Sequence, residues 1–312
     1  PIADLKAGED GRTFTFKVVS KADSTFYFSY DYPSRKLTHL KDKKKELDKP
    51  DWASVSPDGQ RVIYAKDCDL YYMSIADYQK ARKDEKDSTI VEVRLTTDGT
   101  PDFGYLNTDT LCNGKRREVW GYWSPDSKYF ATIITDQRNV KPLWVINSIA
   151  EPRPTLETYK YEMPGETGMP EYHLYLFDVQ AGTRKEIKTA AWKNQSIDLE
   201  GKPFEQKQRD MDLIPRIWQG DNNRFFLTRS SRDLHRIDVC TYTLGADSIV
   251  PIVKERMNTY QETRPIHVLK GGKEFIQWSE RDGWAHLYLY DDKGNLKNRI
   301  TEGPWHVERV VK

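Results

Sequence analysis

Short segments in which apolar and polar residues alternate run along most of the chain. Examples lie at residues 13–18, 25–30, 172–177 and 285–290, and they are rich in Tyr, Phe and Leu. Alternation with a period of two predicts half-buried β-strands, and the Gly, Pro, Asp and Asn residues between such segments predict turns. Helical periodicity is nearly absent; residues 76–86, polar and charged, are compatible with a helical turn or a solvated loop. The pattern predicts an all-β protein.

A turn motif recurs before several of these strands. Ser-Pro-Asp-Gly at residues 56–59 and Ser-Pro-Asp-Ser at residues 124–127 have the composition of a type I turn, with weaker copies at 218–222 and 270–273. The last two copies, near residues 220 and 271, are 51 residues apart, close to the length of one β-propeller blade, about 40–50 residues. We therefore predict a β-propeller of four-stranded blades, about six of them, forming a single domain over residues 1–312.

Charged or polar stretches interrupt this pattern. Residues 41–49 and 78–87 are expected to be mixed-charge connectors, and residues 147–170, rich in Pro and Gly, a long extended excursion from a blade. The polar residues 188–209 are expected to loop out from the sheets as well. Long loops in compact domains are often functional, although a solvated insertion is the simpler interpretation of each.

Charge and composition exclude several classes of protein. The 49 basic and 48 acidic residues give a net charge of +1, whereas a nucleic-acid-binding protein usually carries a strong basic excess. The aromatic content of 12% is too high for a disordered chain. No apolar run approaches the roughly 20 residues of a membrane-spanning helix. The chain begins with neither an initiator Met nor a signal peptide, so we interpret it as a piece of a larger protein.

The three cysteines, Cys68, Cys112 and Cys240, are far apart in the sequence and have no metal-ligand spacing. We interpret them as three unpaired thiols. A single disulfide remains open as the alternative, but the sequence does not assign its partners.

Motifs that carry independent catalysis are missing from the sequence. No Gly-x-Ser-x-Gly nucleophile turn, His-Glu-x-x-His metal motif or nucleotide-binding glycine pattern is present. His267, His286 and His306 are interpreted as packing residues rather than as a catalytic or metal-binding set, and residues 115–117 (Lys-Arg-Arg) as a solvent-facing charged stretch rather than an anion site. We expect no catalytic residue, no metal and no cofactor in this chain.

Several blocks together resemble the N-terminal propeller of the dipeptidyl peptidase IV family. The strongest is residues 279–290, which read Ser-Glu-Arg-Asp-Gly-Trp-Ala-His-Leu-Tyr-Leu-Tyr and continue into residues 300–307. The turn at residues 123–131 and the segment at residues 161–178 match in the family's order. The amino-acid sequence of these blocks is similar to that of bacterial members, in particular those of the Bacteroidetes type.

The resemblance implies a two-part serine exopeptidase of the prolyl oligopeptidase kind. In that family a propeller of about eight blades caps an α/β-hydrolase domain, restricts the entry of large proteins and helps to hold the N-terminus of the peptide. This chain would be the non-catalytic part, and the hydrolase domain would follow residue 312. Its implied partners are a peptide substrate and its own C-terminal hydrolase domain, and the resemblance allows a homodimer. The implied location is periplasmic or secreted.

One departure from the family concerns substrate binding. Active members place two adjacent Glu residues some ten residues before the Trp-Ser-Pro turn, where they bind the free amino group of the substrate. Here residues 111–118 read Leu-Cys-Asn-Gly-Lys-Arg-Arg-Glu, and no Glu-Glu pair occurs anywhere in the chain. Glu118 is the candidate substitute. Arg264 and Lys45 are candidates for the basic group that the family directs toward the substrate carbonyl, and exposed charge is the alternative for each.

Two other functions remain as alternatives. The chain could be a stand-alone protein-interaction propeller or the propeller of an inactive peptidase homologue, since the Glu pair is missing. A propeller that acts on glycans would need clustered carboxylates, which the sequence does not locate. A partial propeller leaves open edges between its first and last blades, and we expect such edges to favour self-association.

Overall fold

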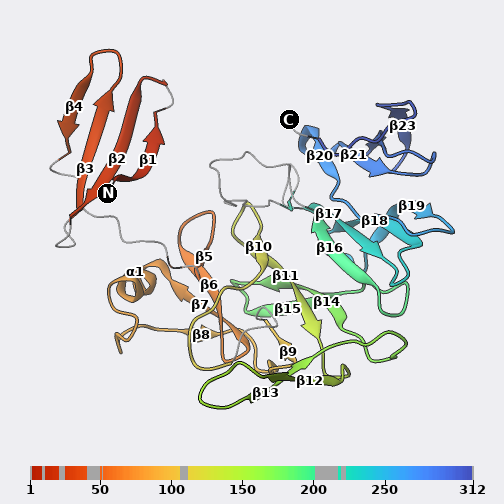
Figure 1. Ribbon diagram of the computed structural model, residues 1–312, viewed down its shortest axis with the longest axis horizontal. Helices are drawn as coiled ribbons and strands as arrows, with labels where there is room; N and C mark the ends of the chain where they lie inside the picture. Colours follow the sequence, from red (N-terminus) through yellow and green to blue (C-terminus); the bar gives the residue numbers. More distant parts are fainter. Residues whose placement is uncertain are drawn as a thin grey trace. The chain divides into compact units, whose positions relative to one another are not determined.

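The computed structural model describes residues 2–8, 11–20, 25–40, 50, 52–105, 112–200, 217–218 and 223–310. These residues form antiparallel β-sheets with one α-helix and one short 3₁₀ helix (Figure 1). The chain divides into two compact units, residues 1–50 with 82–85 and residues 51–81 with 86–312. The all-β prediction is confirmed.

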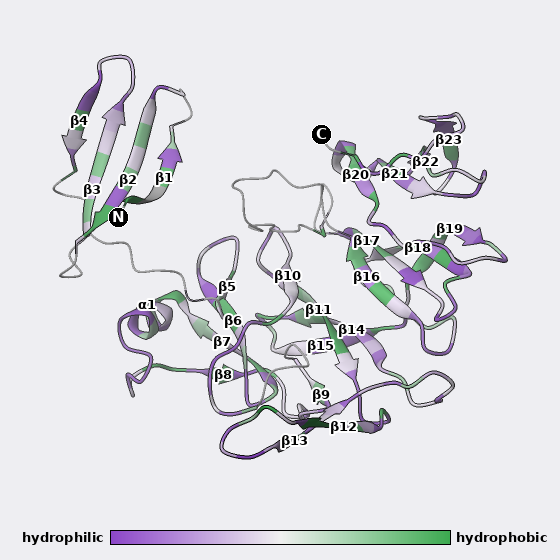
Figure 2. Cartoon of the chain, in the orientation of Figure 1, coloured by the Kyte–Doolittle hydropathy of each residue, from purple (hydrophilic) through white to green (hydrophobic). Residues whose placement is uncertain are grey.

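The first unit is a four-stranded sheet with one apolar face. Its strands pair in chain order: β1 (Ile2–Ala7), β2 (Thr13–Val19), β3 (Thr25–Asp31) and β4 (Lys36–His39). The register places Phe16 opposite Phe28, with ring centroids 5.6 Å apart, and Phe14 opposite Tyr30. Because side chains alternate along a strand, these rings share one face and the intervening polar residues the other. Figure 2 colours the residues of these strands by hydropathy. None of the described side chains of this unit is buried.

The described part of the second unit contains a two-stranded ribbon and four larger sheets, each built on an antiparallel meander of the kind that a propeller repeats. The first contains β5 (Ser54–Val55), β6 (Arg61–Lys66), β7 (Asp69–Ser74) and β8 (Val93–Arg94). The second contains β10 (Gly121–Trp123), β11 (Tyr129–Asp136), β14 (Glu171–Asp178) and β15 (Thr183–Ile187), with β9 (Phe103–Gly104) paired to β11.

The third sheet of this unit contains β16 (Ser196–Glu200), β17 (Arg224–Ser230), β18 (Arg236–Thr243) and β19 (Val250–Arg256). The fourth contains β20 (His267–Leu269), β21 (Glu274–Ser279), β22 (His286–Asp291) and β23 (Leu296–Arg299). With the sheet of the first unit, the described residues hold five blade-like sheets, where the sequence predicts about six.

Successive sheets of the second unit share apolar clusters. Ile63 of β6 packs in one cluster with Phe130 of β11, and Leu174 of β14 in the next with Phe225 of β17. Phe226, the neighbour of Phe225, belongs to a third cluster that includes residues of the last sheet. Adjacent residues of one strand therefore serve two different interfaces. Burying one Phe side chain stabilises the fold by about 1.5–3 kcal/mol. Phe225 and Phe226 are buried against different neighbouring sheets, so the third sheet is stabilised by a neighbour on each side.

The predicted turns have one hydrogen-bond network in common. Ser56 Oγ donates to Asp58 Oδ1 at 2.6 Å and accepts the N–H of Arg61 at 3.0 Å. Ser124 repeats this arrangement with Asp126 at 2.5 Å and Tyr129 at 2.8 Å. The type I turn prediction is therefore supported at both sites. A third copy, at residues 231–236 between β17 and β18, lacks the Pro and escaped the sequence pattern.

The two weaker repeats have different outcomes. Residues 270–273 contain the 3₁₀ helix η1 (Lys270–Gly272) rather than the Ser-Pro-Asp network. Of the other copy, residues 219–222 lie outside the described residues.

The helical-turn alternative for residues 76–86 is confirmed for their first part, whereas the expectation of a mixed-charge connector at residues 78–87 is wrong up to residue 83. Residues Ile75–Lys83 form helix α1. Ser74 is the N-cap of this helix, and its Oγ accepts the N–H of Asp77 at 3.1 Å. Tyr78 and Ala81, three residues apart, lie on one face and are buried. Tyr78 meets the ring of Trp52 edge-on at 5.8 Å. The charged residues occupy the remaining faces and conceal this short apolar stripe in the sequence.

A two-stranded ribbon accounts for the predicted excursion of residues 147–170 in part. It pairs β12 (Pro142–Asn147) with β13 (Thr155–Lys160) and belongs to no larger sheet. Trp144, Ile146 and Leu156 lie on one face of the ribbon, with Ile146 directly opposite Leu156. Their exposed fractions are 66%, 69% and 66%, so the ribbon presents an uncovered apolar face within the described residues.

The expectation that residues 188–209 loop out from the sheets is wrong for residues 196–200. These residues form β16, the first strand of the third sheet. Ile197 is buried in the same cluster as Leu174 and Phe225, and this burial holds the strand in place. Residues 201–209 lie outside the described residues.

Candidate functional site

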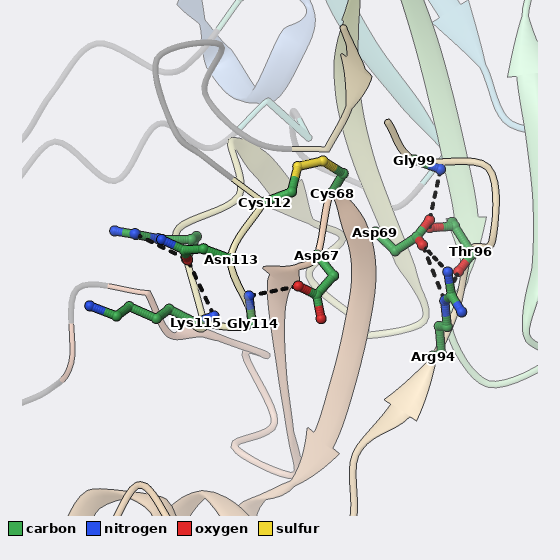
Figure 3. The surroundings of a disulfide bond; sticks show 11 residues. Asp67, Cys68, Asp69, Arg94, Thr96, Gly99, Cys112, Asn113, Gly114 and Lys115 are labelled. Atoms are coloured by element: carbon green, nitrogen blue, oxygen red, sulfur yellow. Dashed lines mark hydrogen bonds and ion pairs between the residues drawn. A yellow bond between two sulfur atoms is a disulfide. The ribbon is translucent and has the colours of Figure 1, made fainter. Parts of the chain in front are cut away.

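A disulfide joins Cys68 to Cys112, with Cα atoms 5.2 Å apart (Figure 3). Cys68 and Asp67 form the two-residue turn between β6 and β7, both with positive φ, 69° and 50°. Two such residues in succession are typical of the type I′ hairpin turn. The interpretation of three unpaired thiols is wrong for this pair. Cys240 is free and buried, and burial raises the pKa of its thiol to about 12.

Residues after the disulfide extend the sheet alongside β6. Gly114 N–H donates to Asp67 Oδ1 at 2.6 Å. Ala65 and Arg117 then exchange main-chain hydrogen bonds of 3.0 Å and 2.8 Å on the side of β6 that β5 occupies further along the strand. The disulfide and these three bonds fix the path of residues 112–117.

Glu92 neutralises two basic groups beside this segment. Its carboxylate accepts hydrogen bonds from Lys66 at 2.6 Å, and from Arg116 and Tyr64 at 2.8 Å each. Burial acts to raise the pKa of Glu92, but the three donors outweigh burial and hold that pKa below its usual range. The Arg116 guanidinium also lies over the ring of Trp52, at 5.5 Å.

These contacts correct the interpretation of residues 115–117 as a solvent-facing stretch. The side chain of Arg116 is only 12% exposed and is part of the packing, whereas Lys115 is exposed. Arg116 is thereby a structural residue.

Asp69 fixes the other side of the disulfide turn. This buried carboxylate accepts hydrogen bonds from Thr96 Oγ1 at 2.7 Å and from the N–H of Gly99 at 2.9 Å, and it pairs with Arg94 (Figure 3). A Cβ on Gly99 would collide with the main-chain carbonyl of Cys68, so only glycine fits there. The Cys68 turn is thus held from both sides.

Glu118 lies in the extended stretch that leads from the disulfide to β10. Glu118 and Trp120 are exposed, Trp120 to 69%, while Val119 between them is buried. In extended chain this alternation places Glu118 and Trp120 on the same side. The next strand is anchored to the preceding sheet, because Trp123 Nε1 donates to the main-chain oxygen of Ser54 at 3.2 Å. The sequence singled out Glu118 but missed Trp120, although the Glu-Val-Trp alternation marks it.

Arg264 lies at a small hollow between the third and fourth sheets, lined by polar and apolar side chains. Its guanidinium stacks over Trp278 at 4.5 Å, and its Nε donates to Glu262 at 2.9 Å. Glu262 raises the pKa of Arg264. Gln261, also at the hollow, is buried, and its side-chain amide has no hydrogen-bond partner among the described residues.

The structure does not unite the three predicted substrate-binding residues. Glu118 precedes β10 of the second sheet, Arg264 lies between the third and fourth sheets, and the two share no hydrogen bond or ion pair in the described part of the chain. Lys45 lies outside the described residues. Of the two that are described, Arg264 is held by protein contacts and Glu118 is presented to solvent.

Of the three late histidines, His286 packs as the sequence predicts, whereas His267 is half-buried and His306 is exposed. His286 is buried, with its ring nitrogens 3.1 Å from Thr301 Oγ1 and 3.0 Å from the oxygen of Gly303. His306 accepts the N–H of Ala285 at 3.2 Å. Within the described ranges no group of His, Cys, Asp and Glu side chains is arranged to hold a metal ion. The described helices include none with the length and apolar character to cross a membrane.

The comparison with protein families gives one extensive match. Residues 20–312 match the family described as the dipeptidyl peptidase IV (DPP IV) N-terminal region. The chain belongs to this family.

Individual relatives agree with the family match. The chain is 22% identical over 297 residues to a probable dipeptidyl peptidase 4 of Aspergillus fumigatus, covering 91% of this chain and 35% of that protein. It is 21% identical over 293 residues to dipeptidyl peptidase 4 of Arthroderma otae, with 92% and 35% covered. The chain thus spans about a third of the length of the curated relatives it matches.

Solved structures show the same fold. The crystal structure of Porphyromonas gingivalis dipeptidyl peptidase 4 superposes with a TM-score of 0.62 at 19% identity, covering 99% of this chain and 40% of that one. A putative dipeptidyl aminopeptidase IV from Bacteroides ovatus gives a TM-score of 0.57 at 16% identity, with 95% and 39% covered. The prediction of a β-propeller built from four-stranded blades is confirmed.

Proposed function

We propose that this chain is the non-catalytic propeller domain of a serine exopeptidase of the dipeptidyl peptidase IV type. The observation that carries the proposal is the family match over residues 20–312, in a chain that covers only 35–40% of relatives named dipeptidyl peptidases. In the whole protein the remaining length would include the α/β-hydrolase domain. The propeller would limit which peptides reach that domain.

Glu118 is the residue we assign to the substrate amino group. Its carboxylate is exposed, and Trp120 is exposed on the same side of the extended stretch. An ammonium group bound between them would gain a charge-assisted hydrogen bond and a cation–π contact. The disulfide, the Asp67–Gly114 bond and the Ala65–Arg117 bridge fix the segment in advance. A site fixed before binding loses less entropy when the peptide arrives.

A peptidase assay on the full-length protein tests both statements. The substrates are Gly-Pro and Ala-Ala chromogenic dipeptides with free and with blocked N-termini, and this chain alone is the control without activity. We expect cleavage of the free-amine substrates only. Glu118→Gln should raise KM with a smaller change in kcat, whereas Glu302→Gln, an exposed Glu outside this segment, should match the wild type.

Other results of this assay would contradict the role of Glu118 or favour a different function for the chain. Equal cleavage of blocked substrates would remove Glu118 from the role proposed. No cleavage by a correctly folded full-length protein would favour an inactive homologue or a stand-alone protein-interaction propeller.

We also propose an extracytoplasmic location, periplasmic or secreted. The Cys68–Cys112 disulfide supports it, because such bonds persist in oxidising compartments and are rare in the cytosol. Thiol labelling of intact cells and of their fractions, with and without reductant, checks it. If thiol reagents label Cys68 and Cys112 in freshly denatured protein without reductant, the two cysteines are reduced in the cell. That result would contradict the proposed location.

We also propose that the protein forms a homodimer through the β12–β13 ribbon. Among the described residues, the ribbon has an unpaired edge on each strand and an apolar face that is left uncovered. A second copy of the chain could cover that face and pair with an edge.

A further inference from the structure

Asn113 is the only asparagine in the chain that is followed by glycine. The main-chain nitrogen of a residue after asparagine can attack the side-chain amide carbon and close a five-membered succinimide ring. A side chain on that residue hinders the approach, and glycine has none. Asn113 and Gly114 are both exposed, so water reaches the pair.

The surroundings of this pair supply groups that the reaction needs (Figure 3). The N–H of Gly114, which carries the attacking nitrogen, donates to the Asp67 carboxylate at 2.6 Å. The Asn113 side-chain oxygen accepts long hydrogen bonds, each 3.4 Å, from the N–H of Lys115 and from the Arg117 guanidinium. A proton acceptor thus lies at the nucleophile, and two donors lie at the oxygen on which negative charge develops.

Each contact favours a definite part of the step. The Asp67 carboxylate can take the proton from the Gly114 nitrogen, as a general base does. The N–H bond lies in the peptide plane, whereas the nitrogen attacks perpendicular to that plane, so the Asp67 contact does not block the attack. Arg117 and the Lys115 N–H stabilise the oxyanion that forms on the Asn113 carbonyl.

We propose that Asn113–Gly114 is a site of self-catalysed deamidation, with Asp67 as the general base. The bond between Gly114 N and Asn113 Cγ forms, the bond between Cγ and Nδ2 breaks, and ammonia leaves with the proton that Asp67 received. One water molecule then opens the ring at either carbonyl. The products are aspartate, with the original main chain, or isoaspartate, in which the main chain runs through the side-chain carbon.

The modification would change the segment that presents Glu118. Either product adds a negative charge beside Lys115 and Arg117, and isoaspartate also lengthens the main chain by one carbon between Cys112 and Glu118. The proposal does not depend on the peptidase function. If the function also holds, affinity for the substrate amine would change as the protein ages.

The test follows the tryptic peptide of residues 95–115 by mass spectrometry, in the folded, oxidised chain kept at neutral pH. This peptide also contains Asn107, which is followed by Thr and serves as the internal control. We expect conversion at Asn113 but not at Asn107, with both the aspartate and isoaspartate forms resolved by chromatography. Asp67→Asn should slow the conversion several-fold, and Asp126→Asn, the same change in a turn of the next sheet, should not.

Three results would overturn the proposal. One is an unmodified Asn113 after incubation long enough to convert a synthetic peptide of residues 110–118. Another is an equal rate in wild type and in Asp67→Asn, when circular dichroism shows both folded. The last is faster conversion after reduction of the disulfide, which would mean that the folded loop protects the pair.

Discussion

Glu200 and Ile266 connect two successive sheets through one hydrogen bond, from the Ile266 N–H to Glu200 Oε2 at 3.0 Å. The other carboxyl oxygen of Glu200 lies 2.5 Å from Thr228 Oγ1. Glu200 is buried, and burial raises its pKa from about 4.5 to about 8. The side chain is therefore protonated at neutral pH in the folded protein.

This raised pKa predicts a pH-dependent stability with a definite sign. The folded state holds a proton that the unfolded state loses, so the free energy of unfolding falls as pH rises from about 4.5 to about 8. Glu200→Gln removes this dependence and should be more stable than wild type near pH 8, by a few kcal/mol. Urea unfolding across this range measures the difference, with Glu302→Gln as control. Parallel pH curves for wild type and Glu200→Gln would contradict the assignment.

The Glu92 cluster predicts a large effect for a single substitution. Glu92→Gln leaves Lys66 and Arg116 beside a neutral group in a partly buried setting, and we expect a loss of about 2–3 kcal/mol. Because the pKa of Glu92 is lowered, its contribution is present above its usual pKa and disappears as pH falls. The difference between wild type and Glu92→Gln should therefore shrink in acid. A constant difference across that pH range would show that the loss comes from packing alone.

The disulfide should stabilise the chain by shortening a loop in the unfolded state. Cys68 and Cys112 are 44 residues apart, and closing a loop of that length contributes about 2–4 kcal/mol. Replacing both cysteines by serine should lower the denaturant midpoint accordingly. Reductant should lower the wild type to the same midpoint and leave the double variant unchanged. A midpoint that stays constant in all four samples would show that the bond is absent or without effect.

The ribbon predicts concentration-dependent self-association. Replacing Trp144 by Ser and Ile146 by Thr removes two apolar side chains from its exposed face and should shift the chain toward monomer in light scattering. Ile149→Thr is the matched control, because Ile149 is 89% exposed but lies between the two strands rather than on them. A wild type that is monomeric over a wide concentration range would exclude both this interface and the edge association expected from the sequence.

Features of the fold that depend on neighbouring residues could be predicted from the sequence. The alternation at residues 172–177 gives most of β14, and the Ser-Pro-Asp turns form because Ser, Asp and the main chain satisfy one another within six residues. β16 could have been found in the same way, since Ile197 and Leu199 alternate with polar residues. The general polarity of residues 188–209 concealed it.

Features that depend on distant residues could not be predicted. Three cysteines allow three pairings, and only the meeting of the β6–β7 turn with Cys112 selects one. The role of Arg116 depends on Glu92 and Trp52, which lie 24 and 64 residues earlier in the sequence. The alternation at residues 118–120 is visible in the sequence, but only the fold shows that Val119 is buried and that Glu118 is exposed.

In three of the described sheets, a turn closes its own hydrogen bonds without help from a neighbouring sheet. The hydrogen bonds at residues 56–61, 124–129 and 231–236 close within the turn itself, and the third copy does so without the Pro. Contact between copies adds to this, as the Asp58 N–H donates to Ser127 Oγ at 2.9 Å, but it is not needed to close either turn. Duplication or deletion of a neighbouring blade would therefore leave these three turns intact. Chain length in such proteins can change one blade at a time, with only the faces between blades left to adapt.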